Sequence, residues 1–175
     1  TPIKSSAASD VYKRQVYLGR SAGFAPCTAE AVTVLLDHYG IDCTGKRAVV
    51  IGRSPVVGRP AAMLLLERNA TVTVCHTRTQ ALSDVTREAD IIVSAAGAAG
   101  CLTAAHVRPG QTIIDVSANW DAAKNTIVGD ADFDAAASIV DAITPVPGGV
   151  GAVTSAVLMR HVVQAAERTL EGGKL

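Results

Sequence analysis

The chain has 175 residues, and its 16 Lys and Arg balance its 16 Asp and Glu, so its formal net charge at pH 7 is zero. This length fits a single domain with a sizeable core. The balanced charge, without any basic run, excludes the electrostatic signature of a nucleic-acid-binding protein, and no apolar run approaches the roughly 18 residues of a membrane span. We therefore expect neither nucleic acid nor a membrane as a partner.

The four cysteines are widely spaced and contain no C-x-x-C pair. This spacing predicts neither a zinc site nor a disulfide framework, so we expect reduced thiols, a cytoplasmic location and no bound metal. Aromatic residues make up 3% of the chain, whereas small and branched aliphatic residues abound. That composition suits a parallel sheet covered by helices.

The first fifteen residues have no helical or strand period and differ in character from the remainder of the sequence. We interpret 1–15 as a foreign or disordered leader and 16–175 as one dinucleotide-binding domain. For the segment from Lys4 to Gln15 a foreign origin is one interpretation and a disordered natural terminus the other. A natural reading frame that encodes these residues without interruption would contradict the first.

Helical and strand patterns alternate along the rest of the chain. The pattern predicts helices at 28–39, 57–68, 81–88, 130–137 and 154–170, and strands at 48–51, 71–75, 91–95, 112–116 and 139–143, with a short candidate at 127–128. This alternation is typical of the α/β class, and we predict a Rossmann-like parallel sheet with helices on both faces. Thr28 is the expected N-cap of the first helix. The last helix should have an apolar side made of Val157, Leu158, His161, Val162, Ala165, Ala166 and Leu170.

The turn after the first strand has the spacing GxSxxxG, a variant of the dinucleotide fingerprint. Gly52 permits the tight turn, Ser54 is small and polar, and Gly58 lets the helix pack close to the strand. Backbone N–H groups at the start of the helix can then face an anion. Taken alone, this pattern also occurs in α/β proteins that bind no nucleotide.

The end of the second strand lacks the acidic residue that holds the ribose 2′-hydroxyl in NAD sites. The run from His76 to Thr79 instead offers hydroxyls and the Arg78 guanidinium, which would attract a 2′-phosphate. Arg53 would pair with that phosphate through two hydrogen bonds or lie along the adenine. We therefore predict a preference for NADP over NAD. The alternative is that Arg53 and Arg78 are ordinary surface charges.

Two further segments come after the later strands. The small residues at 94–97 would let a ribose or nicotinamide approach the sheet edge, and Asp115 is expected to cap a loop rather than to contact a ligand. The run 145–151 combines two prolines with three glycines, and we expect it to line a ligand cleft. His38 and His76 are interpreted as surface and loop residues, so no side chain is identified as a general base.

Four separated motifs carry a resemblance to a known family: Pro26-Cys27-Thr28, 50–60, 69–79 and the run TPVPGGVG at 144–151. In order and spacing, from about Val16 onward, they resemble the methylenetetrahydrofolate dehydrogenase/methenyltetrahydrofolate cyclohydrolase family. TPVPGGVG is the most specific of the four. The resemblance implies an NADP cofactor, tetrahydrofolate derivatives as substrates of the intact enzyme, and a homodimer.

The resemblance also assigns residues. The NADP-binding turn of the family is matched by Gly52, Arg53 and Ser54; the hydroxyl residue that meets the 2′-phosphate is matched by Thr77; and the residue whose backbone meets the nicotinamide side is matched by Ala118. The loop that borders the folate cleft is matched by Pro147, Gly148 and Gly149. Ser117 stands where the family has glycine, a change that would crowd the nicotinamide pocket.

The family places its catalytic lysine, in a Tyr-x-x-x-Lys arrangement, on a domain that would precede Val16. We assign no catalytic residue to this chain and expect it to bind cofactor without catalysis, with its first and last helices packing on that domain. The intact enzyme would oxidise 5,10-methylenetetrahydrofolate by hydride transfer to NADP and hydrolyse the methenyl product. One alternative is a noncatalytic dinucleotide-binding or dimerisation module. A second, an unrelated NADP oxidoreductase, is disfavoured by TPVPGGVG.

Overall fold

The computed structural model describes residues 23–170, so the predicted leader at 1–15 lies outside the described residues. The elements, in chain order, are α2 (Cys27–His38), β1 (Arg47–Ile51), α3 (Gly58–Glu67), β2 (Thr71–Cys75), α4 (Leu82–Arg87), β3 (Ile91–Ser94), the 3-10 helix η1 (Ala104–His106), β4 (Thr112–Asp115), β5 (Asn119–Asp121), β6 (Thr126–Val128), α5 (Phe133–Ala137), β7 (Ala142–Ile143) and α6 (Val150–Leu170). None of these helices is long and apolar enough to cross a membrane.

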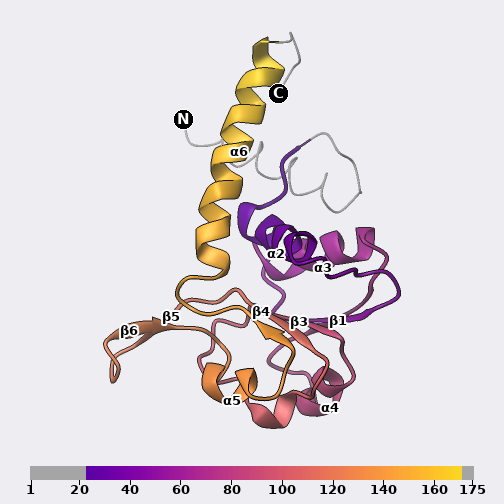
Figure 1. Cartoon of the computed structure of the whole chain (residues 1–175), viewed down its shortest axis with the longest axis vertical. Coiled ribbons are helices and arrows are strands. Elements are labelled where there is room, and N and C mark those ends of the chain that lie inside the picture. The colour runs from indigo at the N-terminus through magenta and orange to yellow at the C-terminus, as the bar shows by residue number, and fades with distance from the viewer. Residues whose placement is uncertain (1–22, 171–175) are drawn as a thin grey trace.

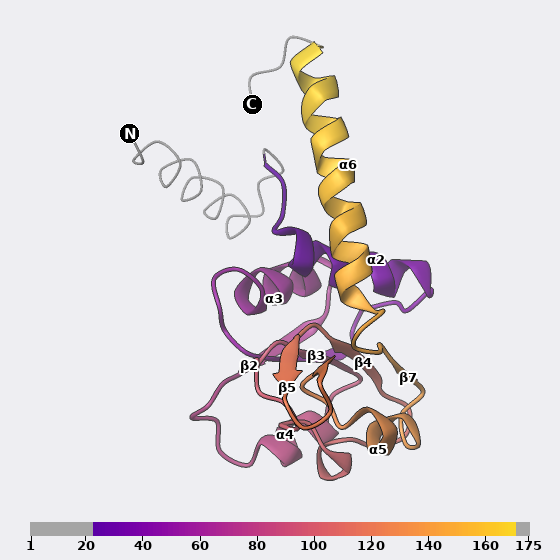
Figure 2. The same cartoon turned by 90° about the vertical axis from the view of Figure 1, so that its left-hand side faces the viewer.

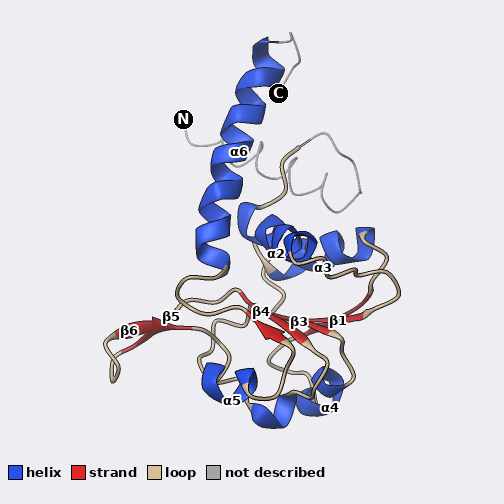
Figure 3. Cartoon of the chain, viewed as in Figure 1, coloured by secondary structure: helices blue, strands red, loops and turns tan. Residues whose placement is uncertain are grey.

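A five-stranded parallel sheet in the order β2-β1-β3-β4-β7 forms the centre of the molecule. Helices α2, α3 and α6 lie on one side of it and α4 and α5 on the other (Figure 1; Figure 3). The four residues of β3 are all buried, as expected for an apolar strand covered on both faces. The predicted α/β, Rossmann-like architecture is confirmed.

Each face of the sheet has its own hydrophobic core. On the α2 and α3 side, Val32, Leu36 and Leu65 are fully buried against the sheet. On the opposite side, Leu102 and Ile113 are fully buried beneath the shorter helices. Because the two cores share the strands between them, the positions of the strand ends are fixed from both faces.

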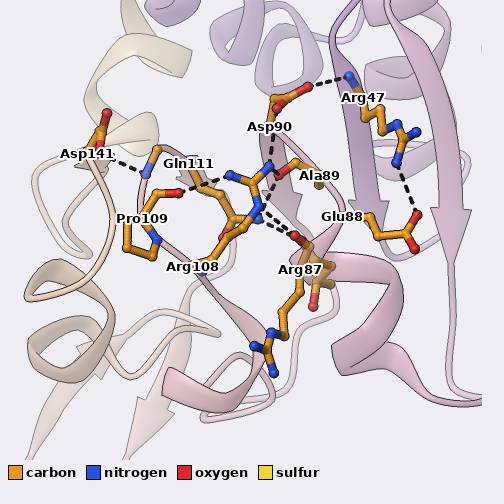
Figure 4. Close-up of polar contacts among 11 residues, drawn as sticks. Arg47, Arg87, Glu88, Ala89, Asp90, Arg108, Pro109, Gln111 and Asp141 are labelled. Carbon is orange, nitrogen blue, oxygen red and sulfur yellow. Dashed lines mark hydrogen bonds and ion pairs between the residues drawn. The ribbon is translucent and has the colours of Figure 1, made fainter.

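The amino-terminal ends of the strands are tied together by Arg108 (Figure 4). Its guanidinium donates to the carbonyls of Arg87 and Ala89 at 2.7 and 2.9 Å and contacts the Asp90 carboxylate at 3.3 Å. Gln111, which is fully buried, also donates to the Ala89 carbonyl at 2.8 Å. This network satisfies buried carbonyl groups where α4 leads into β3.

Several predicted boundaries were wrong. The N-cap of α2 is Pro26, whose carbonyl accepts the Glu30 N–H, and Thr28 lies inside the helix. The last strand is only Ala142–Ile143 instead of 139–143, because the N–H groups of residues 139 and 140 donate to the Ala136 carbonyl and finish α5. The last helix begins at Val150 and not at 154, directly after the glycines of the preceding loop.

The predicted apolar side of α6 is only partly buried. Val157 and His161 are buried, whereas Leu158, Val162 and Leu170 are 52%, 58% and 88% exposed. Figure 2 shows the reason: α6 passes α2 with its first turns and then extends away from the sheet. Much of this apolar side is therefore exposed in the part of the chain that the structure describes.

The contact between α2 and α6 is polar at its centre. Glu30 on α2 accepts hydrogen bonds from Arg160 and lies 2.8 Å from Nε2 of His161. On the other side of the imidazole, Nδ1 lies 3.6 Å from the Cys27 thiol, and the Phe24 ring lies 4.6 Å from the ring centre. These contacts join the first and last described helices.

A separate antiparallel hairpin, β5 and β6, projects from the body (Figure 1). The short strand predicted at 127–128 is confirmed within β6, but its partner β5 was not predicted. Trp120 and Ile127 face each other across the hairpin and are 65% and 43% exposed. The single aromatic residue on β5 gives no alternating pattern, so the sequence held no strand signal there.

Candidate functional site

The carboxyl ends of the parallel strands bring the predicted site residues to one edge of the sheet. Ile51 pairs with both Cys75 and Ser94, and Ser94 pairs with Asp115, so β1 to β4 end at the same level. The segments after these strands contain Gly52, Arg53, Ser54, Thr77 and Ala118. Ligands of open α/β sheets bind at this edge.

Two glycines allow close backbone approaches in the β1–α3 turn. Gly52 has φ +113° and its N–H donates to the Cys75 carbonyl at 2.8 Å. A Cβ at Gly52 would collide with the Ala95 carbonyl, and a Cβ at Gly58 would collide with the Gly52 carbonyl. The predicted tight turn and the close packing of helix against strand are both confirmed.

Ser54 caps the start of α3, a local role that was not predicted. Its hydroxyl accepts the N–H groups of Val57 and Gly58 at 3.1 and 3.3 Å, and its carbonyl accepts the Arg59 N–H. The first N–H groups of α3 are therefore occupied by Ser54 in this conformation. No acceptor within 23–170 receives the N–H groups of Arg53 and Ser54 themselves, which leaves these two donors for an anion.

The turn after β2 is held by its own side chains. The His76 N–H donates to the Thr79 hydroxyl at 2.9 Å, and Nδ1 of His76 accepts the Arg78 N–H at 3.1 Å. His76 is thus a loop residue, as predicted, and it also stabilises the turn. Thr77 and Arg78 are exposed, and the turn contains no carboxylate.

Asp130 organises the loops after β3 and β4, a role that the sequence did not indicate. This residue was predicted to begin a helix, but it is fully buried, and α5 is capped by Asp132 instead. Its carboxylate accepts six hydrogen bonds, from the side chains of Ser94, Ser117 and Asn119 and the N–H groups of Ala96, Gly97 and Ala98. The donors lie 11 to 36 residues earlier in the chain, so no local pattern could reveal them.

Ser117, expected to crowd the nicotinamide pocket, is drawn into this network. Its hydroxyl donates to Asp130 at 2.7 Å and accepts the Gly97 N–H at 3.1 Å. The hydroxyl is therefore directed toward the buried carboxylate. Ala118, the next residue, is exposed.

Asp115 caps loops, as expected. It is 2% exposed and accepts the N–H groups of Ser117 and Ala131 at 3.1 and 2.8 Å. Burial raises the pKa of this carboxyl above its usual value. Burial, together with the nearby Asp130 carboxylate, also raises the pKa of the Cys101 thiol to about 11.

The proline- and glycine-rich loop connects β7 to α6. Gly148 has φ +100°, and a Cβ at Gly149 would collide with the Pro145 carbonyl. Gly148 and Gly149 line a hollow of about 1100 Å³ together with residues of α2 and β7, whereas Pro147 is not part of that lining. The loop is joined to β4 because the Thr144 hydroxyl accepts the Asp115 N–H at 2.8 Å.

The turns at this edge of the sheet offer hydrogen-bond donors and positive charge. In the part of the chain that the structure describes, no group of three or more His, Cys, Asp or Glu side chains could hold a metal ion. In the turns after β1 and β2, the exposed groups include the Arg53 and Arg78 guanidinium groups, hydroxyls and backbone N–H groups, which recognise phosphates. The roles of the individual residues in ligand binding stay predictions.

Residues 26–170 match the family described as "Tetrahydrofolate dehydrogenase/cyclohydrolase, NAD(P)-binding domain". The chain is 54% identical over 154 residues to "Bifunctional protein FolD" of Carboxydothermus hydrogenoformans, an alignment that covers 87% of this chain and 54% of the relative. The chain therefore spans about half the length of the curated relatives it matches.

Solved structures agree with this comparison. The bifunctional FolD methylenetetrahydrofolate dehydrogenase/cyclohydrolase of Campylobacter jejuni has a TM-score of 0.86 at 45% identity, covering 89% of this chain and 55% of that one. The Trypanosoma brucei FolD enzyme, solved in complex with NADP cofactor and inhibitor, has a TM-score of 0.85 at 38% identity, covering 91% and 57%.

Proposed function

Because this chain belongs to the tetrahydrofolate dehydrogenase/cyclohydrolase family, whose NAD(P)-binding domain it matches, we propose that it binds NADP at the carboxyl edge of its sheet. The observation that carries this proposal is the adjacency of two turns that contain no carboxylate. The Gly52–Ser54 turn follows β1, and the turn containing Thr77 follows its neighbour β2. The Gly52 N–H is bonded directly to the end of β2, at Cys75.

The side chains of these turns fit the cofactor. The Arg53 guanidinium can pair with a ribose 2′-phosphate through two hydrogen bonds, and the Thr77 hydroxyl can donate to the same group. The available N–H groups of Arg53 and Ser54 suit the pyrophosphate. When bound, the cofactor would supply the hydride acceptor, and the protein would supply its position.

Titration calorimetry of the purified chain tests this proposal. We expect tighter binding of NADP than of NAD, and Arg53→Ala should weaken NADP binding about tenfold with a smaller effect on NAD, since a charge-assisted contact to the 2′-phosphate is lost. Arg87→Ala is the matched control, because Arg87 is exposed and lies at the end of α4, at the opposite edge of the sheet. Equal affinities for NADP and NAD, or an Arg53 variant that behaves like the control, would refute the assignment.

For the whole protein, we propose the family's reactions: oxidation of 5,10-methylenetetrahydrofolate with NADP, then hydrolysis of the methenyl product. Pro147, Gly148 and Gly149 would border the folate cleft, and the exposed parts of α2 and α6 would contact the remainder of the enzyme. The residues from 16 to 175 would bind cofactor without turnover. The alternative is a noncatalytic dinucleotide-binding or dimerisation module.

A complementation assay separates these two possibilities. The chain alone, incubated with 5,10-methylenetetrahydrofolate and NADP, should form no NADPH. Adding the N-terminal half of a family relative should restore measurable turnover if the chain is a cofactor half. Turnover by the chain alone would contradict binding without catalysis, and no restoration would favour the noncatalytic module.

We also propose a homodimer that works in the cytoplasm, with neither nucleic acid nor a membrane as partner. The four free thiols support a reducing compartment, and the zero net charge gives nucleic acid no attraction. The exposed Trp120–Ile127 pair supports a second copy as the partner, because a two-stranded ribbon alone is marginally stable. Sedimentation equilibrium should show a dimer that Trp120→Ser weakens, and a monomeric parent chain would overturn this proposal.

A further inference from the structure

The loops after β3 and β4 are held by one buried carboxylate. Oδ2 of Asp130 accepts hydrogen bonds from Ser94, Ser117 and the Ala96 N–H at 2.9, 2.7 and 2.7 Å, and more weakly from the Gly97 N–H at 3.3 Å. Oδ1 accepts the Ala98 N–H and the Asn119 amide at 2.7 and 3.1 Å. Three of the six donors are backbone groups of one loop.

The charge of this carboxylate is balanced by dipoles rather than by a cation. Between residues 23 and 170, no Lys, Arg or His side chain forms an ion pair with Asp130. Consecutive N–H groups that converge on an anion form a concave site of the type that binds phosphates. Here the Asp130 carboxylate occupies that concavity, so the N–H donors of this loop stabilise the shape of the loop.

The exposed Ala118 lies between two residues that donate to the same carboxylate. Ser117 precedes it and Asn119 follows it, and both are anchored to Asp130. The β3 loop is anchored from its other side, because the Ala95 carbonyl occupies the space that a Cβ of Gly52 would need. Asp130 therefore fixes the β3 loop and the β4 loop to each other, and the β3 loop also contacts the turn after β1 at Gly52.

We infer that Asp130 is a positioning residue that holds the Ala118 backbone and the β3 loop in place for the nicotinamide half of the cofactor. This inference rests on the proposed NADP binding. Asp130 has no exposed surface, so it acts through the loops and not by contact with the ligand. The adenosine half, next to Arg53 and Thr77, depends on other turns and should be insensitive to Asp130.

Asp130→Asn tests the inference, because the amide has the same shape as the carboxylate. With its oxygen kept at the Oδ2 position, its NH₂ group would face the Ala98 N–H and the Asn119 amide, two donors that then lack an acceptor. The full chain is titrated with NADP and with adenosine 2′,5′-bisphosphate, which contains only the adenosine side. We expect about tenfold weaker binding of NADP and less than about twofold change for the bisphosphate.

Two further variants keep the test decisive. Asp132→Asn, at the exposed cap of α5, is the matched control and should change neither affinity. If the Asp130 variant does not fold, Ser117→Ala removes one hydroxyl from the network and should weaken NADP about threefold without affecting the bisphosphate. Amide NMR supplies a readout without ligand: the Ala96 and Ala98 N–H signals should move upfield in Asp130→Asn.

The outcomes separate the inference from the proposal beneath it. If Asp130→Asn weakened the binding of both ligands equally, Asp130 would stabilise the whole site, and the positioning role would be overturned. Unchanged NADP binding in the Asp130 and Ser117 variants would also overturn the positioning role. The same conclusion would follow if the parent chain bound the bisphosphate as tightly as NADP. A parent chain that binds neither ligand would refute NADP binding itself.

Discussion

Replacing Gly52 with alanine should both destabilise the fold and disrupt the site. Gly52 has φ +113°, where an L side chain costs about 1 kcal/mol or more. Its new Cβ would also collide with the Ala95 carbonyl, a backbone group that cannot rotate away. Forced displacement of packed groups costs about 1–3 kcal/mol, so the total should be about 2–4 kcal/mol.

Gly45→Ala is the matched control for this substitution. Gly45 has φ +71°, but a Cβ there meets nothing within 4 Å, so only the backbone cost of about 1 kcal/mol applies. Urea unfolding followed by circular dichroism gives both free energies of unfolding. A loss at Gly52 no larger than at Gly45 would refute the claim that contact with the β3 loop, and not the positive φ, makes glycine necessary.

Three further predictions concern titration and packing. The pKa of Asp90 is lowered by the hydrogen bond from the Arg47 N–H and, to a smaller extent, by Arg108. The ionised Asp90 carboxylate therefore stabilises the fold above the usual pKa of 3.8, and this stabilisation is lost as the pH falls through the lower folded-state pKa. The difference in unfolding free energy between the parent and Asp90→Asn should shrink below pH 3.8, and a constant difference would contradict this. Arg108→Lys should cost about 1–3 kcal/mol in urea unfolding, because an ammonium cannot reach the same carbonyls and carboxylate; a neutral result would count against the network. Cys101, with a pKa of about 11, should be alkylated slowly by iodoacetamide at neutral pH and faster as pH rises, and Asp130→Asn should lower that pKa by removing a nearby negative charge. Fast alkylation of Cys101 at neutral pH in the folded parent would contradict the raised pKa of this thiol.

The architecture was predictable because its signals are local. The strand Ile91–Ser94 is apolar throughout and buried on both faces, and its alternation with helices indicated a parallel sheet. Gly52 and Gly58 were also assigned correctly, since a strand, a glycine turn and a helix lie within a dozen residues of one another. In such cases neighbouring residues set the backbone conformation directly.

The features that the sequence missed depend on partners far along the chain. Asp130 was predicted as the start of a helix because an acidic residue fits a helix start, but its six donors belong to distant segments of the chain. The apolar side of α6 was traced from its helical period, but Leu158 and Val162 are exposed, because period alone does not say which neighbour covers a residue. Long-range hydrogen bonds and surfaces that pack on a partner cannot be inferred from the spacing of residues in the sequence.

The polar contact between α2 and α6 affects the order in which the parts of this protein fold during synthesis. Glu30 bonds to Arg160 and His161, which follow it by 130 and 131 residues. Contacts between such distant segments form slowly, because the long stretch of chain between them must be closed into a loop first. During synthesis α2 leaves the ribosome before α6, so it receives this partner only after α6 has followed. Until then the face of α2 that meets α6 is open to other chains.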